Sequence, residues 1–342
     1  MRHAVLALAL VVIGAARAAL GFEIEEERLF PASGNGPELS ILSTADTFVF
    51  APLIEAYQAR NPGVAVRYVV AGSQAVFAAI NDEGARFDLV ISSAMDLQMK
   101  LANDGFAAPH RAVEPVPAWA RWQDRLYAFT QEPVVLLVAR PALTGLPMPR
   151  SRRDLIALLR DHPERFAGRI GTYDPRLSGA GYLFATQEAR QSDSYWRLAE
   201  VMGATRPRLY TNTNQMIADL QAGRLAMAYN VLGSYAEPRL APDGPDTVIE
   251  LEDYTLTLLR TAFVPRNATR PELGHGFLTF LLSTGGRAVF RNETGLPPVD
   301  DAQLAENPHR RPIRLDPGLL VYLDAQKRRR FLEEWTAAFV QP

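Results

Sequence analysis

Apolar and polar positions follow two alternating periods along the first third of the chain. Three short apolar runs have the pattern of buried strands, at 39–42, 64–70 and 87–91. After each run, a polar turn opens a segment with the apolar spacing of a helix, at about 48–59, 72–82 and 96–104. Strand, turn and helix repeated three times predict an α/β domain with a parallel sheet.

A second unit of the same kind is expected between residues 132 and 260. Its apolar strands are expected at 133–139, 169–173, 225–231 and 255–264. Its helices are expected at about 151–160, 180–189, 193–202 and 213–222. Two more helices, 272–284 and 331–340, lie on either side of a polar, proline-rich tail. The pattern therefore predicts two α/β units and a C-terminal segment.

The N-terminus has the layout of a secretory signal peptide. A basic start precedes the apolar run 4–16, which is shorter than the ~20 residues that a membrane span needs. Ala16-Arg17-Ala18 supplies the small residues of a cleavage site. We therefore expect residues 1–18 to be removed and the mature chain to be exported. An uncleaved anchor and a buried N-terminal helix are the alternatives.

Composition excludes several classes of function. The 342 residues include no cysteine, which excludes disulfides, zinc–thiolate sites, iron–sulfur clusters and cysteine nucleophiles. A net charge of −2 gives no bulk electrostatic case for nucleic acid. The five histidines lack metal-ligand spacing, and the chain has neither a G-x-S-x-G nucleophile turn nor a P-loop. We therefore expect a protein without a cofactor or resident metal, and not an enzyme.

Polar turns follow five of the predicted strands, at 44–47, 72–74, 92–94, 174–179 and 230–235. In open α/β sheets, ligands bind beyond the carboxyl ends of the strands, near helix N-termini. Any one of these turns is explained by residues that cap their own helix, but five together favour a ligand cleft between two lobes. The candidate contacts are Thr44, Asp46, Thr47, Ser73, Gln74, Ser92, Ser93, Ser178, Gly179, Ser234 and Tyr235.

Most of these candidates are neutral hydrogen-bond donors, which suit a negative ligand. Hydroxyls and helix-start N–H groups replace the hydration of an anion without a buried formal charge in the empty cleft. Asp46 does not fit this scheme as a direct anion contact. We expect Asp46 to cap the helix that follows it, or to accept hydrogen bonds from ligand hydroxyls.

The segment 39–109, which begins LSILSTADTFVFAPLIEAYQARNPGV, resembles the first lobe of periplasmic solute-binding proteins of ABC transporters. More narrowly, it resembles the ferric-ion and organophosphate-binding branch of the type II fold. The stretch QAGRLAMAYNVLGSYAEPRL is similar to the second-lobe element of that branch, and GLPPV at 295–299 to its closing segment. The resemblance implies a two-lobed α/β protein of the periplasm, with a hinge and a ligand cleft between the lobes.

The resemblance also implies how the chain divides. Lobe 1 is expected to comprise about 37–131 plus 261–300, and lobe 2 to comprise 132–260. The chain would cross between them near 131–133 and 260–262. Residues 301–342 are expected to form a tail and a helix that pack on the lobes.

The expected ligand is a small anionic solute: an organic phosphate, a phosphonate or a carboxylate. Ferric-binding members carry adjacent tyrosines where this chain has Gly233-Ser234-Tyr235. Fe(III) needs hard anionic oxygen donors, and one phenolate with hydroxyls supplies few of them. The resemblance implies a monomer that delivers its solute to an inner-membrane ABC permease or to the periplasmic domain of a sensor kinase. A ferric-ion-binding protein is the first alternative, and a secreted hydrolase on a two-lobed α/β scaffold is the second.

Overall fold

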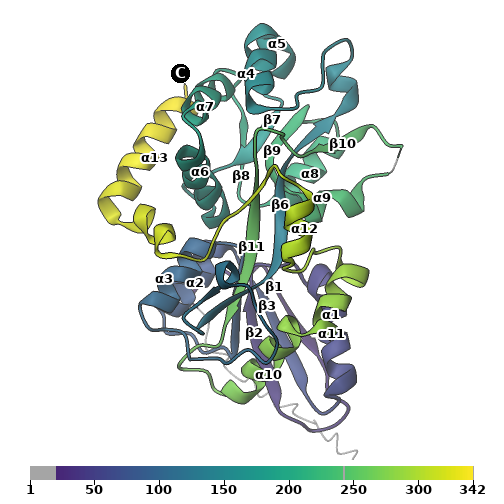
Figure 1. Ribbon diagram of the computed structural model, residues 1–342, viewed down its shortest axis with the longest axis vertical. Coiled ribbons are helices and arrows are strands. Elements are labelled where there is room, and N and C mark those ends of the chain that lie inside the picture. The colour runs from purple at the N-terminus through teal and green to yellow at the C-terminus, as the bar shows by residue number, and fades with distance from the viewer. Residues whose placement is uncertain (1–20, 242, 342) are drawn as a thin grey trace, which may run out of the picture.

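The computed structural model describes residues 21–241 and 243–341, which form two lobes stacked along the long axis (Figure 1). The predicted signal peptide, residues 1–18, lies outside the described residues. Among the described residues, no helix has both the length and the apolar character needed to cross a membrane.

The strands are β1 Glu26–Phe30, β2 Glu38–Ser43, β3 Ala65–Val70, β4 Leu89–Ser92, β5 Arg121–Trp122, β6 Leu126–Ala139, β7 Ile170–Tyr173, β8 Arg208–Tyr210, β9 Met227–Leu232, β10 Asp246–Ile249, β11 Thr255–Phe263 and β12 Arg310–Pro312. The helices are α1 Thr47–Arg60, α2 Ser73–Asn81, α3 Met95–Asn103, α4 Arg152–Asp161, α5 Pro163–Phe166, α6 Gly179–Gln191, α7 Ser194–Ala204, α8 Thr213–Gln221, α9 Gly233–Ala236, α10 Pro271–Leu282, α11 Thr284–Val289, α12 Asp301–Glu306 and α13 Ala325–Phe339.

The strands form one mixed sheet with the order β1-β3-β2-β4-β11-β6-β9-β7-β8. β2 is parallel to β3 and β4, and β7 is parallel to β8 and β9, which confirms the predicted parallel pairing within each unit. The sheet is not parallel throughout, because β1 pairs antiparallel with β3 and β11 pairs antiparallel with β4 and β6. Helices cover both faces, as the alternation of strand and helix predicts.

The strands β6 and β11 connect the two lobes. β6 pairs with β11 up to Pro133 and with β9 from Val134 onward, so one strand belongs to both halves of the sheet. The prediction started this strand at Pro133, seven residues too late, because Gln131 and Glu132 break the apolar run although both are fully buried. Helix α10 follows β11 and packs against β2 and β4 (Figure 1). These contacts support the proposed division into 37–131 plus 261–300 and 132–260.

The C-terminal segment contacts elements of both units. The 3₁₀ turns at Pro317–Leu323 pack on α3, and α13 packs on α7. The indole ring of Trp335 is buried and stacks on Phe339. Helix α13 begins six residues earlier than the apolar pattern predicts, because its first turns are polar and are started by Asp324, whose side chain accepts from the Lys327 N–H.

Candidate functional site

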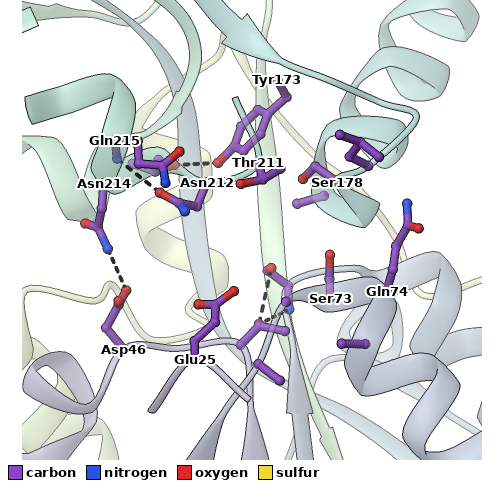
Figure 2. A pocket seen from close by; sticks show the side chains of 18 of the residues that line it. Glu25, Asp46, Ser73, Gln74, Tyr173, Ser178, Thr211, Asn212, Asn214 and Gln215 are labelled. Atoms are coloured by element: carbon purple, nitrogen blue, oxygen red, sulfur yellow. Dashed lines mark hydrogen bonds between the residues drawn. The ribbon is translucent and has the colours of Figure 1, made fainter. Parts of the chain in front are cut away.

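A cavity of about 970 Å³ lies between the two lobes. Polar side chains enter it from both sides (Figure 2). Seven of the predicted contacts line it: Thr44, Asp46, Ser73, Gln74, Ser93, Ser178 and Tyr235. The structure therefore brings together, in one cavity, residues that the sequence places in five separate turns.

Four helices begin at this cavity, because the strand before each of them ends at its edge. The residues at their N-caps are Asp46 for α1, Gly72 for α2, Ser178 for α6 and Asn212 for α8, and all four line the cavity. The first N–H groups of a helix have no intrahelical acceptor, and each helix start carries about half a positive charge. Gly72 has no side chain to cap α2, so the first N–H groups of α2 remain available to a ligand.

Ser73 of α2 and Gly179 of α6 meet across the cleft. The Gly179 N–H donates to Ser73 Oγ at 3.0 Å. A Cβ atom on Gly179 would lie 2.8 Å from Ser73 Oγ and 3.1 Å from both Ala94 Cβ and Leu97 Cδ1. The absence of a side chain thus permits the close approach of the two lobes. Gly179, predicted as a ligand contact, bonds to Ser73 of the other lobe instead and does not line the cavity.

Asp46 makes a second bridge between the lobes. Asn214 Nδ2 donates to Asp46 Oδ2 at 2.9 Å (Figure 2). A third bridge runs from Gln74 Nε2 to the Arg176 carbonyl at 3.2 Å. The expectation that the Asp46 side chain caps α1 is wrong: the residue stands at the N-cap, but its carboxylate makes no capping hydrogen bond. It faces the other lobe instead.

Three further predicted contacts are buried behind the cavity wall, which corrects their assignment. Ser92 Oγ accepts from the Ala94 N–H at 3.1 Å and serves the turn before α3. Thr47 lies in the first turn of α1 and is only 2% exposed. Ser234 Oγ donates to Glu132 Oε2 at 2.6 Å, so this hydroxyl is already used.

Sequence analysis missed Arg260, the cation of the cavity wall. Its Nε and Nη2 donate to the two oxygens of Glu132 at 2.9 and 3.1 Å, which leaves Nη1 as the nitrogen not engaged with that carboxylate. Thr130 Oγ1 also donates to Glu132, at 2.8 Å. Burial, the largest single influence, lowers the pKa of Arg260, but the charge and hydrogen bonds of Glu132 together with Tyr235 and Tyr68 more than offset it and hold the pKa above its usual value. The guanidinium is therefore permanently charged. No spacing in the sequence pairs residues 132 and 260.

Two phenols, Tyr173 and Tyr235, also line the cavity. Tyr173 was not predicted, and it brings the second tyrosine that the sequence of the Gly233-Ser234-Tyr235 turn lacks. Tyr173 shares a hydrogen bond with Thr213. Burial raises the pKa of Tyr173 to about 12 and also raises the pKa of Tyr235. Both phenols are therefore neutral hydrogen-bonding groups at physiological pH.

The cavity also has an acidic side that the prediction did not include. Glu23 and Glu25 line it together with Asp46. Burial, and then the charges of Asp46 and Glu23, raise the pKa of Glu25. None of the three carboxylates forms an ion pair within the described residues. The acidic run that follows the predicted signal peptide was a visible signal in the sequence, but β1, which continues this run, is an exposed edge strand without apolar alternation.

Further unpredicted polar lining comes from residues 211–215, which form the turn before α8 and the first turn of that helix. This turn follows β8, a strand of only three residues that has no apolar run to reveal it. Asn212 caps α8 through a 3.0 Å hydrogen bond from the Gln215 N–H. Across the described part of the chain, no group of three or more histidine, aspartate or glutamate side chains is placed to hold a metal ion.

Comparisons with known proteins agree with this geometry. Residues 39–294 match the family model described as bacterial extracellular solute-binding protein. A substrate-binding protein of an ABC transporter from Agrobacterium tumefaciens is 32% identical, with a TM-score of 0.88 over 94% of this chain and 99% of that chain. No match was found among curated proteins.

Two more distant structures share the fold. The periplasmic binding protein AfuA from Actinobacillus pleuropneumoniae, with fructose-6-phosphate bound, is 15% identical with a TM-score of 0.72, over 90% of this chain and 99% of that one. Iron-bound HitA from Pseudomonas aeruginosa is 19% identical with a TM-score of 0.62, over 88% of this chain and 99% of that one. At these identities the likeness concerns the fold alone.

Proposed function

The chain belongs to the bacterial extracellular solute-binding proteins, and we propose that it captures a small polar solute between its lobes and delivers it to an ABC permease. The family is non-enzymatic, which removes the secreted hydrolase from the alternatives. The observation that carries the proposal is a cavity of about 970 Å³ lined by both lobes and bridged by direct hydrogen bonds between them. A sensor kinase domain is the second candidate partner.

We further propose that the solute carries an anionic group, such as a phosphate, a phosphonate or a carboxylate. Four helix N-termini at the cavity support this, since their N–H groups and dipoles favour negative charge. Arg260 Nη1 and the hydroxyl of Ser178 add donors: Ser178 Oγ accepts from the Gly181 N–H, and its own proton is free for a ligand. Capture would proceed by hinge bending, with the solute favouring the closed state.

A thermal-unfolding screen of the purified mature chain tests this proposal. A solute at ~100 times its dissociation constant should add ~2.7 kcal/mol to stability and should reduce the radius of gyration measured by X-ray scattering. Ser73→Ala and Ser178→Ala should each weaken binding by about ten- to a hundredfold. The exposed Ser33→Ala variant is the control and should bind normally. If no small phosphate, phosphonate or carboxylate stabilises the protein, the proposal fails.

Ferric-ion binding is kept as the second candidate because Tyr173 and Tyr235 face one cavity with carboxylates nearby. Iron would have to remove the protons of two phenols whose pKa values burial raises. Titration with ferric citrate decides the matter, because phenolate–iron coordination gives visible charge-transfer absorption. We expect a colourless protein.

Export to the periplasm is part of the same proposal. The family acts outside the cytoplasm, and the basic start, apolar run and Ala16-Arg17-Ala18 of the sequence supply the export signal. N-terminal sequencing of protein from the cell envelope should begin near Ala19. Protein retained in the cytoplasm with Met1 intact would contradict the assignment.

A further inference from the structure

We propose that the solute is a zwitterion, whose protonated amine binds at Glu25 and Asp46 while its anionic group binds on the Arg260 side of the cavity. This inference rests on the proposed function and names the class of solute. It follows from the charges and the hydrogen-bond partners of the residues that line one cavity.

Acceptors are in excess on the side of Glu25 and Asp46. Glu23 adds a third carboxylate there, and within the described residues these three side chains accept only one hydrogen bond, from Asn214 Nδ2 to Asp46. A carboxylate that loses its hydration without gaining a donor costs roughly as much as a lost hydrogen bond, so a ligand that brings donors is favoured at this place. In Figure 2 the carboxylate of Glu25 points into the cavity.

Donors are in excess on the other side. Arg260 is 1% exposed, is paired with Glu132 through two of its nitrogens, and lines the cavity. The hydroxyl of Ser178 lines the same cavity. These groups fit an anionic or strongly accepting group on the solute.

The sum of the charges excludes a simple anion as the best fit. Arg260 and Glu132 cancel, so Glu23, Glu25 and Asp46 leave the cavity with a negative excess. A cleft with walls of one sign attracts the opposite charge. A solute with only negative charge would oppose this excess, whereas an amine compensates it.

An amine fits this side better than a metal ion. No group of three or more carboxylate or histidine side chains is close enough to hold a metal within the described residues, so the acidic groups are too far apart for one small cation. An ammonium group has three hydrogen-bond donors. It is joined to the anionic group of the solute by a carbon chain, whose length sets the distance between the two charges. It can therefore bond to one carboxylate while the rest of the solute reaches Arg260.

Matched pairs of compounds test the inference by calorimetry on the mature protein. Each pair shares its anionic group and differs only in the amine: O-phosphoethanolamine against ethyl phosphate, and 5-aminopentanoate against pentanoate. The member with the amine should bind at least tenfold more tightly, the factor expected for a hydrogen bond to a charged group. Glu25→Gln should abolish this preference, and Asp46→Asn should reduce it.

Glu26→Gln is the matched control, because Glu26 is the next residue, is exposed and lies outside the cavity lining. It should leave the preference for the amine unchanged. Tighter binding of the compounds without an amine, or an unchanged preference in Glu25→Gln, would overturn the inference while leaving the proposed function standing. If neither member of any pair binds, the inference is wrong as well. If the wider screen of small anions is then also negative, the proposed function fails with it.

Discussion

Adding one methyl group at Gly179 should weaken solute binding more than it weakens the fold. The new Cβ would lie 2.8 Å from Ser73 Oγ, a distance that requires movement, and 3.1 Å from Ala94 Cβ and Leu97 Cδ1. The hydrogen bond from the Gly179 N–H to Ser73 Oγ would be lost, at about 0.5–1.5 kcal/mol. Overpacking at the same contact adds roughly 1–3 kcal/mol.

Because these atoms meet only where the two lobes touch, opening the cleft relieves the strain. The cost of about 2 kcal/mol or more therefore falls on the closed state, and the apparent dissociation constant should rise at least about thirtyfold. Calorimetry with a solute from the screen measures this, and the melting temperature of the unliganded protein should stay nearly constant. Gly63→Ala is the control, since a Cβ on Gly63 meets nothing within 4 Å.

A double variant separates this explanation from general damage. Replacing Ser73 with alanine in the Gly179→Ala background removes the atom at 2.8 Å, so the second substitution should cost less affinity there than in the wild type. Equal affinities for Gly179→Ala and Gly63→Ala would refute the reasoning. A melting temperature that falls in parallel with affinity would also refute it.

Three other predictions concern stability and binding. Burial, and then His275, lower the pKa of His110 from 6.5 to about 4. As the pH drops from 7 towards 4, the unfolded chain therefore binds the proton before the folded one does, and stability should fall. His110→Gln should flatten the slope of melting temperature against pH. Glu188→Gln removes the partner of buried Arg152 at 2.6 Å and should cost about 3–5 kcal/mol in urea unfolding, whereas the exposed Glu334→Gln should cost under about 1 kcal/mol. Ser151→Ala should cost about 1 kcal/mol, because it removes the capping box of α4, and should leave solute affinity unchanged.

The sequence predicted the regular elements well where burial is one-sided or continuous. The strands near 39–42 and 64–70 and the helices after them lie within two residues of the observed β2, β3, α1 and α2. These elements are local, because each apolar run is bounded by its own turn residues. The failures are the strands whose pairing is not visible locally. β1 is exposed at four of five positions, and β8 has only three residues.

The site was predicted by position more successfully than by charge. The rule that ligands bind beyond the carboxyl ends of strands found Ser73, Ser93 and Ser178, because backbone topology fixes where those residues go. The same rule says nothing about Glu25, which precedes an edge strand, or about Arg260, which lies inside a strand. Charged side chains reach the cavity through tertiary pairing, which a single sequence does not reveal. The predicted anion preference was therefore based on an incomplete set of lining residues.

Arg260 joins solute binding to the connection between the lobes. It lies on β11 at a register irregularity in the pairing with β6, and its partner Glu132 lies on β6 beside Pro133. Ser234 lies in the first turn of α9 in lobe 2 and donates a hydrogen bond to the same carboxylate. Arg260 of β11, Glu132 of β6 and Ser234 of lobe 2 are thus joined by hydrogen bonds. Nη1 of Arg260, which lines the cavity, is the nitrogen that does not bond to Glu132. A solute that binds this nitrogen touches the strand about which the lobes would bend, so the energy of that contact acts directly on the equilibrium between open and closed forms.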